Sequence, residues 1–294
     1  MRGMNARHSP PPTKTPGDIT TPGWQEVLKR TWRAASSQHS SLDAAAIAFF
    51  GVWGFFPALA ALVGLGGLLF GRTEVLHLLS RIRIDLPEGF NVVVGGQLQA
   101  IASHSRGLSS ATLIGGLAIA LWSAMRAMRG MITALNSIYR EEEKRTFWRR
   151  HALALAFACF GGIFLLVVLA LILAIPPWVT GSSRNPTVAL FAATRWPILI
   201  VLLMVSLSAL YRYGPSRPTA QWRWVSWGAA ASATIWVIGS LLFSYYASQF
   251  NHLNPLLGSL GAFTLFFLWS YLTVLTVLLG AQMNAEMERQ AKRE

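Results

Sequence analysis

Residues 224–285 read WVSWGAAASATIWVIGSLLFSYYASQFNHLNPLLGSLGAFTLFFLWSYLTVLTVLLGAQMNA, which is 62 residues without an Asp, Glu, Lys or Arg. A helix rises about 1.5 Å per residue, so about 20 apolar residues cross a hydrocarbon core about 30 Å thick. The stretch is long enough for two crossings, and its polar segment NHLNP at 251–255 predicts the turn between them. Because backbone groups inside a bilayer must be satisfied internally, this run predicts a helical membrane protein.

The composition of the 294-residue chain agrees with this prediction. Apolar residues make up 53% and charged residues only 13%, about half of the ~25% found in ordinary soluble domains. The formal net charge of +13 favours anionic partners, either nucleic acid or the inner face of a membrane. The single cysteine, Cys159, excludes an intramolecular disulfide and any metal site built from several cysteines.

Further charge-free stretches complete the prediction of the fold class. We expect an all-α, polytopic integral membrane protein with six transmembrane helices and additional amphipathic interfacial helices. The six spans are predicted at about residues 44–70, 108–125, 152–179, 190–211, 225–250 and 256–283.

The two ends of the chain are predicted to be tails outside the membrane domain. Residues 1–22 are rich in proline and predict a disordered tail, residues 23–288 form the six-helix domain, and residues 289–294 form a second tail. A short interfacial helix is predicted after Thr21-Pro22, which would supply the cap and the first helical position. Its apolar face consists of Trp24, Leu28, Thr31, Trp32 and Ala35.

The basic residues predict the orientation of the chain. If both termini are cytoplasmic, the inner segments hold 19 of the 25 Lys and Arg residues, and the outer loops hold 6. Residues 72–106 then form the largest external segment. This distribution explains the net charge by attraction to the anionic inner leaflet, so we expect no nucleic-acid partner.

The segment after the second span predicts a basic helix face. Spacings of 4, 3, 4, 3 and 4 place six residues on it: Trp122, Arg126, Arg129, Thr133, Asn136 and Arg140. The face could bind an anionic headgroup or substrate, or it could simply anchor the helix to anionic lipid at about 1 kcal/mol per basic residue. Adding Arg212 from the same predicted side gives a candidate anion-binding or substrate-binding surface of Arg126, Arg129, Asn136 and Arg212.

Two further features have alternative interpretations. Pro57 lies within the first span and is a candidate hinge, although neighbouring helices commonly tolerate such a kink. In the last span, a stripe of small and polar residues is either a helix-packing face or a polar transport route. The stripe consists of Ser270, Thr273, Gly280 and Asn284.

Signals for catalysis are poor. None of the six histidines shares a metal-ligand spacing with another, and no pair of acidic residues lies inside a predicted span. A Gly-x-Ser-x-Gly nucleophile elbow and a phosphate-binding loop are also missing from the sequence. We therefore expect no catalytic, cofactor-binding or metal-binding residues.

Motifs along residues 43–288 resemble the YihY/virulence factor BrkB family. They are AAAIAFF at 44–50 followed by Phe56-Pro57, LWSA at 121–124, ALNSIY at 134–139, YRYGP at 211–215, GSLG at 258–261, LWSY at 268–271 and LGAQMNAE at 279–286. The resemblance implies a six-span protein of the bacterial inner membrane, linked to serum resistance and to the handling of envelope lipid or lipopolysaccharide. The family also carries an old ribonuclease name, but this chain lacks the His and Asp cluster that a metal-dependent ribonuclease needs.

The chain departs from the family pattern at two places. Phe49-Phe50 stands where members often have two tyrosines, and Gln282 stands where they often have a glutamate. The resemblance and the missing catalytic signals together lead us to expect a transporter or flippase-like protein for an envelope lipid or another amphipathic anionic molecule. The alternatives are an envelope scaffold or interaction protein and, less favoured, a membrane-bound ribonuclease. Membrane lipids are the expected partners, and the sequence predicts no oligomeric state.

Overall fold

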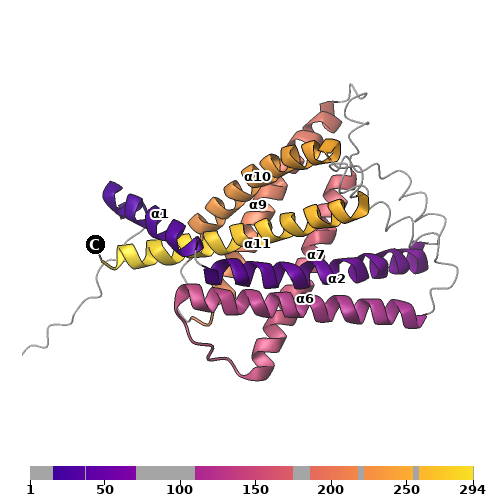
Figure 1. Ribbon diagram of the computed structural model, residues 1–294, viewed down its shortest axis with the longest axis horizontal. Coiled ribbons are helices and arrows are strands. Elements are labelled where there is room, and N and C mark those ends of the chain that lie inside the picture. The colour runs from indigo at the N-terminus through magenta and orange to yellow at the C-terminus, as the bar shows by residue number, and fades with distance from the viewer. Residues whose placement is uncertain are drawn as a thin grey trace, which may run out of the picture.

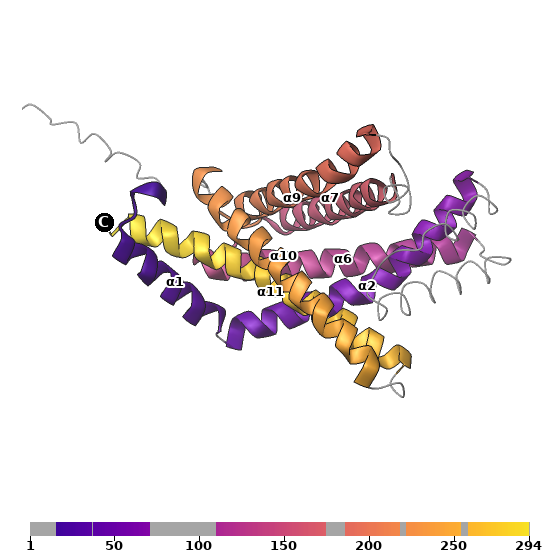
Figure 2. The same cartoon turned by 90° about the horizontal axis from the view of Figure 1, so that it is seen from above.

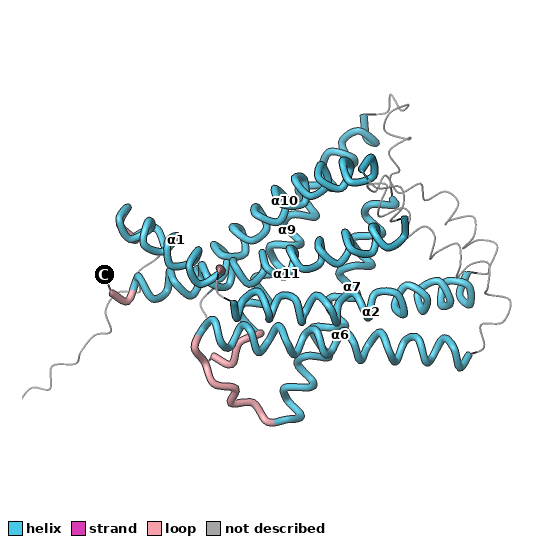
Figure 3. Tube along the Cα trace, in the orientation of Figure 1, coloured by secondary structure: helices cyan, strands magenta, loops and turns pink. Residues whose placement is uncertain are grey.

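The computed structural model describes residues 16–36, 38–70, 110–174, 186–217, 222–253 and 258–293. Every regular element in these ranges is helical, which confirms the all-α prediction (Figures 1 and 3). A short 3-10 helix, η1 (Pro16–Asp18), is followed by seven α-helices. They are α1 (Thr21–Ala35), α2 (Gln38–Phe70), α6 (Ser110–Tyr139), α7 (Phe147–Ala174), α9 (Pro186–Tyr213), α10 (Trp222–Leu253) and α11 (Gly258–Ala291).

The long helices alternate in direction along the chain. One end of the bundle gathers the starts of α2 and α10 and the ends of α6, α9 and α11, and we call it the polar end (Figure 1). Helices α2 and α6 lie side by side over most of their length, and α11 packs against α2 and α10. Figure 2 shows α7 and α9 as a pair, with α6 between this pair and α2.

Among the described residues, five helices are long and apolar enough to cross a membrane. Their apolar windows are His39–Leu62, Phe147–Val168, Thr194–Tyr213, Trp224–Gln249 and Phe263–Ala291. Helix α6, which contains Arg126 and Arg129, is not one of these five over its described part. The remaining predicted span, the second along the chain at 108–125, therefore stays a prediction. Its first two residues lie outside the described ranges.

The N-terminal segment differs from the prediction in two details. Ile19 is buried against Val27, Trp224 and Met287, so residues 16–22 of the expected tail pack against the helices. Residues 1–15 lie outside the described ranges. The N-cap of α1 is Thr20 rather than Thr21, and its hydroxyl accepts a hydrogen bond from the backbone nitrogen of Gly23 at 3.3 Å.

The predicted apolar face of α1 is only partly buried against the protein, and its other residues are exposed. Val27 and Thr31 are buried toward α11, whereas Leu28 and Trp32 of the predicted face are exposed. Exposed apolar side chains beside Lys29 and Arg33 suit an interfacial helix, which remains a prediction.

Small residues set the register between α2 and α6. A Cβ on Gly54 would lie 2.8 Å from the Cβ of Ser123, so the two helices can approach this closely only at a glycine. The Ser123 hydroxyl donates to the Phe50 carbonyl at 2.9 Å, which fixes the same register through a hydrogen bond. Pro57 is half-buried within a continuous α2, and its carbonyl faces Gly116.

Candidate functional site

The register of α2 and α6 places Arg126 beside aromatic rings. Its guanidinium carbon lies 5.7 Å from the Phe50 ring centroid and 5.5 Å from that of Trp122. Phe50 contacts Phe49, which stacks on Trp53, and it meets Trp122 edge to face. We call Phe49, Phe50, Trp53, Trp122 and Arg126 the arginine patch.

The arginine patch faces away from the protein at the level of an apolar segment. Phe50 stands near the middle of the 24-residue window His39–Leu62, and Arg126 is 13 residues before the end of α6, about 20 Å along the helix. Trp53 and Trp122 are 58% and 52% exposed, and Arg126 is exposed as well. In the described part of the chain, no carboxylate pairs with Arg126.

The other residues of the predicted anion surface occupy different surroundings. Arg129 is half-buried, and its Nε has no partner within the described ranges. Arg212 lies over Trp222, with its guanidinium carbon 4.6 Å from the ring centroid. Asn136 is buried and is ten residues from Arg126 on the same helix, about 15 Å away. The structure thus brings Asn136 to the turn that follows Arg212, while Arg126 stands apart.

Asn136 joins α6 to that turn. Its Oδ1 accepts from the Ser216 backbone nitrogen at 2.7 Å, and its Nδ2 donates to Glu143 Oε2 at 3.0 Å. Arg145 donates from Nη1 to the Gly214 carbonyl at 2.8 Å. Its Nη2 donates to the carbonyls of Tyr213 and Pro215, at 3.0 and 2.8 Å. The α6–α7 connection is therefore fastened to the end of α9 and the turn that follows it through these three backbone carbonyls.

The end of α11 continues this network. Both Glu288 carboxylate oxygens accept from Arg217 Nη1 at 2.8 Å, and the guanidinium lies 3.9 Å from the Tyr139 ring centroid. Arg289 pairs with Glu286 and donates from Nη2 to the Ile138 carbonyl at 2.6 Å. Burial raises the pKa of the Tyr139 phenol, whose buried hydroxyl lies near Asn284 without a hydrogen bond of good geometry.

The predicted stripe on α11 faces α10 over three of its four residues. Thr273 accepts from Trp236 Nε1 at 3.1 Å, and Asn284 Oδ1 accepts from the Gly228 backbone nitrogen at 2.8 Å. A Cβ on Gly280 would lie 2.7 Å from the Tyr211 hydroxyl and 2.6 Å from the Ser232 Cβ. The Ser270 hydroxyl bonds the Phe266 carbonyl of its own helix. These contacts favour the packing interpretation of the stripe.

Tyr211 completes the meeting point of α9, α10 and α11. Its side chain is fully buried, and its hydroxyl donates to the Val277 carbonyl at 2.7 Å. We call the hydrogen-bonded residues at this end of the bundle the polar junction, and it consists of Asn136, Glu143, Arg145, Tyr211, Ser216, Arg217, Gly228, Asn284, Glu288 and Arg289. The sequence analysis included Tyr211 only as the first residue of the YRYGP motif, and it did not single out Arg145 or Arg217.

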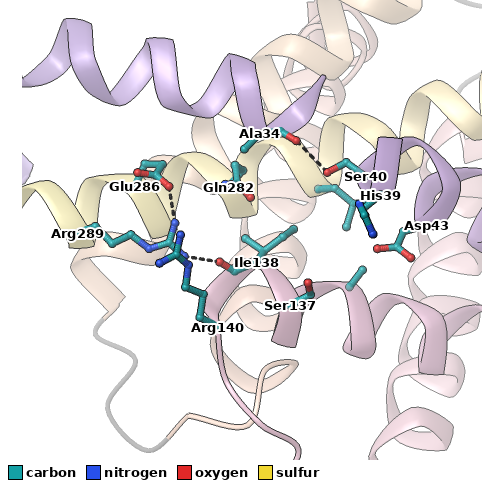
Figure 4. Close-up of a pocket in the computed structure, with 12 residues that line it drawn as sticks. Ala34, His39, Ser40, Asp43, Ser137, Ile138, Arg140, Gln282, Glu286 and Arg289 are labelled. Carbon is teal, nitrogen blue, oxygen red and sulfur yellow. Dashed lines mark hydrogen bonds and ion pairs between the residues drawn. The ribbon is translucent and has the colours of Figure 1, made fainter. Parts of the chain in front are cut away.

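A cavity of about 220 Å³ lies beside the polar junction, between α1, α2, α6 and α11 (Figure 4). Gln282, the amide at the position of the second family departure, lines this cavity and is 9% exposed. No three His, Cys, Asp or Glu residues within the described ranges group in a way that could hold a metal ion.

Fold and site together define a polytopic α-helical membrane protein with a packed polar end and a cationic patch beside an apolar helix segment. The chain belongs to the virulence factor BrkB family, whose model matches residues 31–294. No solved structure matches it significantly.

Several bacterial proteins are similar to the chain. A Bacillus subtilis protein named ribonuclease-like protein YfkH is 27% identical over 273 residues, covering 90% of this chain and 96% of YfkH. A UPF0761 membrane protein of Nitrosospira multiformis is 28% identical over 214 residues, which is 71% of this chain but only 48% of that protein. A UPF0761 membrane protein of Delftia acidovorans is 24% identical, covering 92% of this chain and 66% of its own length.

Proposed function

We propose that the protein is a transporter or flippase-like protein of the bacterial inner membrane, acting on an amphipathic anionic molecule such as a phosphate-bearing envelope lipid. In this proposal the polar end faces the cytoplasm, in agreement with the bias of 19 of the 25 basic residues toward that side. The observation that carries the proposal is the arginine patch.

A cation among apolar helices is unfavourable unless it has a partner. Arg126 lies beside Phe50, within the apolar window of α2, and no carboxylate pairs with it in the described part of the chain. Charged residues beside apolar helix segments are candidates for functional sites because the desolvation of an unpaired charge is costly. The phosphate of a lipid moving along the protein surface would supply the missing counter-charge.

The aromatic rings of the arginine patch suit the rest of such a substrate. Phe49, Trp53 and Trp122 are exposed on the same surface, so acyl chains could pack against them while the headgroup pairs with Arg126. Simple anchoring to the leaflet surface is the alternative interpretation of Arg126, which directly follows the predicted span 108–125.

The proposal is tested by reconstituting the full chain in liposomes. Transfer of a fluorescent phosphatidylglycerol between leaflets is followed by quenching from outside, and a fluorescent phosphatidylcholine serves as the neutral comparison. Arg126→Ala should reduce transfer of the anionic lipid by about tenfold or more, since one charge-assisted contact contributes about 1.5–3 kcal/mol. Arg126→Lys should restore only part of it because lysine lacks the planar guanidinium that lies against the rings.

The control variant is Arg149→Ala. Arg149 is an exposed arginine in the first turn of α7 without a hydrogen-bond or ion-pair partner in the described ranges. It should transfer lipid at the parent rate. Equal rates for Arg126→Ala and the parent protein would refute the proposed site, and no transfer by any correctly folded form would favour the scaffold alternative.

A nuclease activity is the second candidate because YfkH is named ribonuclease-like. Purified protein incubated with labelled RNA and Mg²⁺ or Mn²⁺ tests it directly. Sustained cleavage that co-purifies with the protein through two chromatography steps would replace the transport proposal by an enzymatic one.

A further inference from the structure

The cavity at the polar end has charged groups at both ends. In Figure 4, Asp43 and His39 of α2 lie at one end, and Arg140 and Arg289 lie at the other, next to Glu286. The side chains of α6 and α11 line the space between these ends. A cavity of about 220 Å³ with separated charges is suited to a small polar group rather than to an acyl chain.

Several polar groups of the cavity are not used by the fold. Arg289 is engaged by Glu286 and by the Ile138 carbonyl. By contrast, Asp43, Arg140 and Gln282 have no hydrogen-bond or ion-pair partner within the described residues. Asp43 and Arg140 are exposed, and His39, one turn before Asp43, interacts with it electrostatically. Gln282, which is 9% exposed, presents an amide on the wall between the charged ends.

The backbone of Arg140 gives a second, independent indication. Its φ of 57° places it in the left-handed region, where residues other than glycine are uncommon. The Arg140 nitrogen donates to the Ser137 carbonyl at 3.1 Å and the Glu141 nitrogen to the Asn136 carbonyl at 2.9 Å, which is the helix end that favours glycine. Strained non-glycine positions concentrate at functional sites, and here the strain places an arginine on the cavity wall.

We propose that this cavity binds a zwitterionic group that carries an ammonium and a phosphate. The ammonium pairs with Asp43, the phosphate pairs with Arg140, and the Gln282 amide bonds the atoms between them. A simple anion would be opposed by Asp43 and a simple cation by Arg140, so a ligand with both charges fits best. The inference does not depend on transport at Arg126, because the cavity and the arginine patch share no residue.

Binding of soluble probes to the full chain in detergent tests the proposal by calorimetry. Glycerophosphoethanolamine carries both charges, glycerol 3-phosphate carries only the phosphate, and ethanolamine carries only the ammonium. We expect glycerophosphoethanolamine to bind at least about tenfold more tightly than either of the others, as the loss of one charge-assisted contact predicts.

Two variants assign the contacts. Asp43→Asn should weaken glycerophosphoethanolamine by about 10- to 100-fold and leave glycerol 3-phosphate unchanged or slightly tighter. Arg140→Gly should weaken both phosphate-bearing probes, yet its melting temperature should be equal or higher because glycine suits the left-handed backbone. Loss of binding without loss of stability separates recognition from folding, and Arg149→Ala is the matched surface-charge control.

The source of the zwitterion is found by comparing lipid nanodiscs. If a lipid headgroup is the natural occupant, discs of phosphatidylethanolamine should block the soluble probe, whereas discs of phosphatidylglycerol should not. A free solute is the occupant if both discs leave binding intact. Equal affinity for all three probes, or unchanged binding in both Asp43→Asn and Arg140→Gly, would overturn the proposal.

Discussion

The arginine patch and the polar junction, which both include residues of α6, use their arginines in opposite ways. In the arginine patch, Arg126 contacts the rings of Phe50 and Trp122 and is exposed. In the polar junction, Arg145 donates three hydrogen bonds to backbone carbonyls, and Arg217 binds both oxygens of Glu288. The junction therefore uses its charges to hold helices together, whereas the patch leaves a charge available to something outside the protein.

The polar junction is also more tightly packed than the arginine patch. At the polar junction, Gly228 and Gly280 let the backbones of α10 and α11 approach so closely that side chains fill the space where a Cβ would stand. At the patch, the aromatic side chains of α2 and α6 are about half exposed. We expect substitutions at the junction to lower stability and substitutions at the patch to alter function.

The largest expected effect is on Gly228. A Cβ at this position would lie 2.3 Å from Asn284 Cγ, so Gly228→Ala must displace a buried amide or separate α10 from α11. We expect a loss of about 3 kcal/mol in the free energy of unfolding, since overpacking and a broken buried hydrogen bond act together. Thermal or steric-trapping unfolding in detergent measures it.

Gly239→Ala is the matched control for that variant. Gly239 lies on the same helix, and a Cβ there would meet nothing within 4 Å. Its unfolding free energy should stay within about 0.5 kcal/mol of the parent or rise, because alanine favours the helix. Equal destabilisation of both variants would show that α10 tolerates no added methyl group, and the argument from close packing would fail.

The next effect concerns the clamp made by Arg145. Arg145→Ala removes donors from the carbonyls of Tyr213, Gly214 and Pro215, and we expect a loss of about 2 kcal/mol. Arg149→Ala, which removes an exposed arginine nearby, should change the unfolding free energy by less than about 0.5 kcal/mol. A silent Arg145→Ala would mean that water replaces the guanidinium at this helix end.

The sequence predicted much of the fold for a clear physical reason. Charge-free runs such as 224–285 leave the backbone no alternative to helix in a membrane, and α10 and α11 occupy that run. The second span was harder, because Arg126 and Arg129 interrupt the apolar part of α6. Periodicity also predicted the buried face of α1 only in part, since Thr31 of the predicted face is buried whereas Leu28 and Trp32 are exposed.

The candidate site was predictable only in part. Spacing placed Arg126 and Asn136 on one face of a helix. It could not show that Arg126 lies against Phe50 or that Asn136 bonds the Ser216 backbone. Arg145 and Arg217 stood in polar loops, where a basic residue normally indicates only solvation or orientation. Their roles depend on contacts between segments about 70 residues apart, which a single sequence does not reveal.

Two tyrosines offer a smaller and more discriminating test of the junction. The Tyr211 hydroxyl donates to Val277, so Tyr211→Phe should cost about 1 kcal/mol. The Tyr139 hydroxyl is buried without a partner in the described ranges, so Tyr139→Phe should be neutral or stabilising by up to about 1 kcal/mol. A loss of stability in Tyr139→Phe would indicate that its hydroxyl bonds Asn284 or an ordered water, and Tyr139 would then belong to the polar junction.

The smallest effect on stability is expected at Arg126, although its effect on function should be large. Arg126→Gln removes contacts with two rings, worth about 0.5–1 kcal/mol at an exposed site, but it also removes an unpaired charge from an apolar segment. The two terms oppose each other, so the unfolding free energy should stay within about 1 kcal/mol of the parent. The same unfolding assay, run beside Arg145→Ala, measures the difference between patch and junction. If Arg126→Gln destabilises the protein as much as Arg145→Ala does, then Arg126 is a structural residue like those of the junction. The patch would then no longer be distinguished as the place where the protein offers a charge to a ligand.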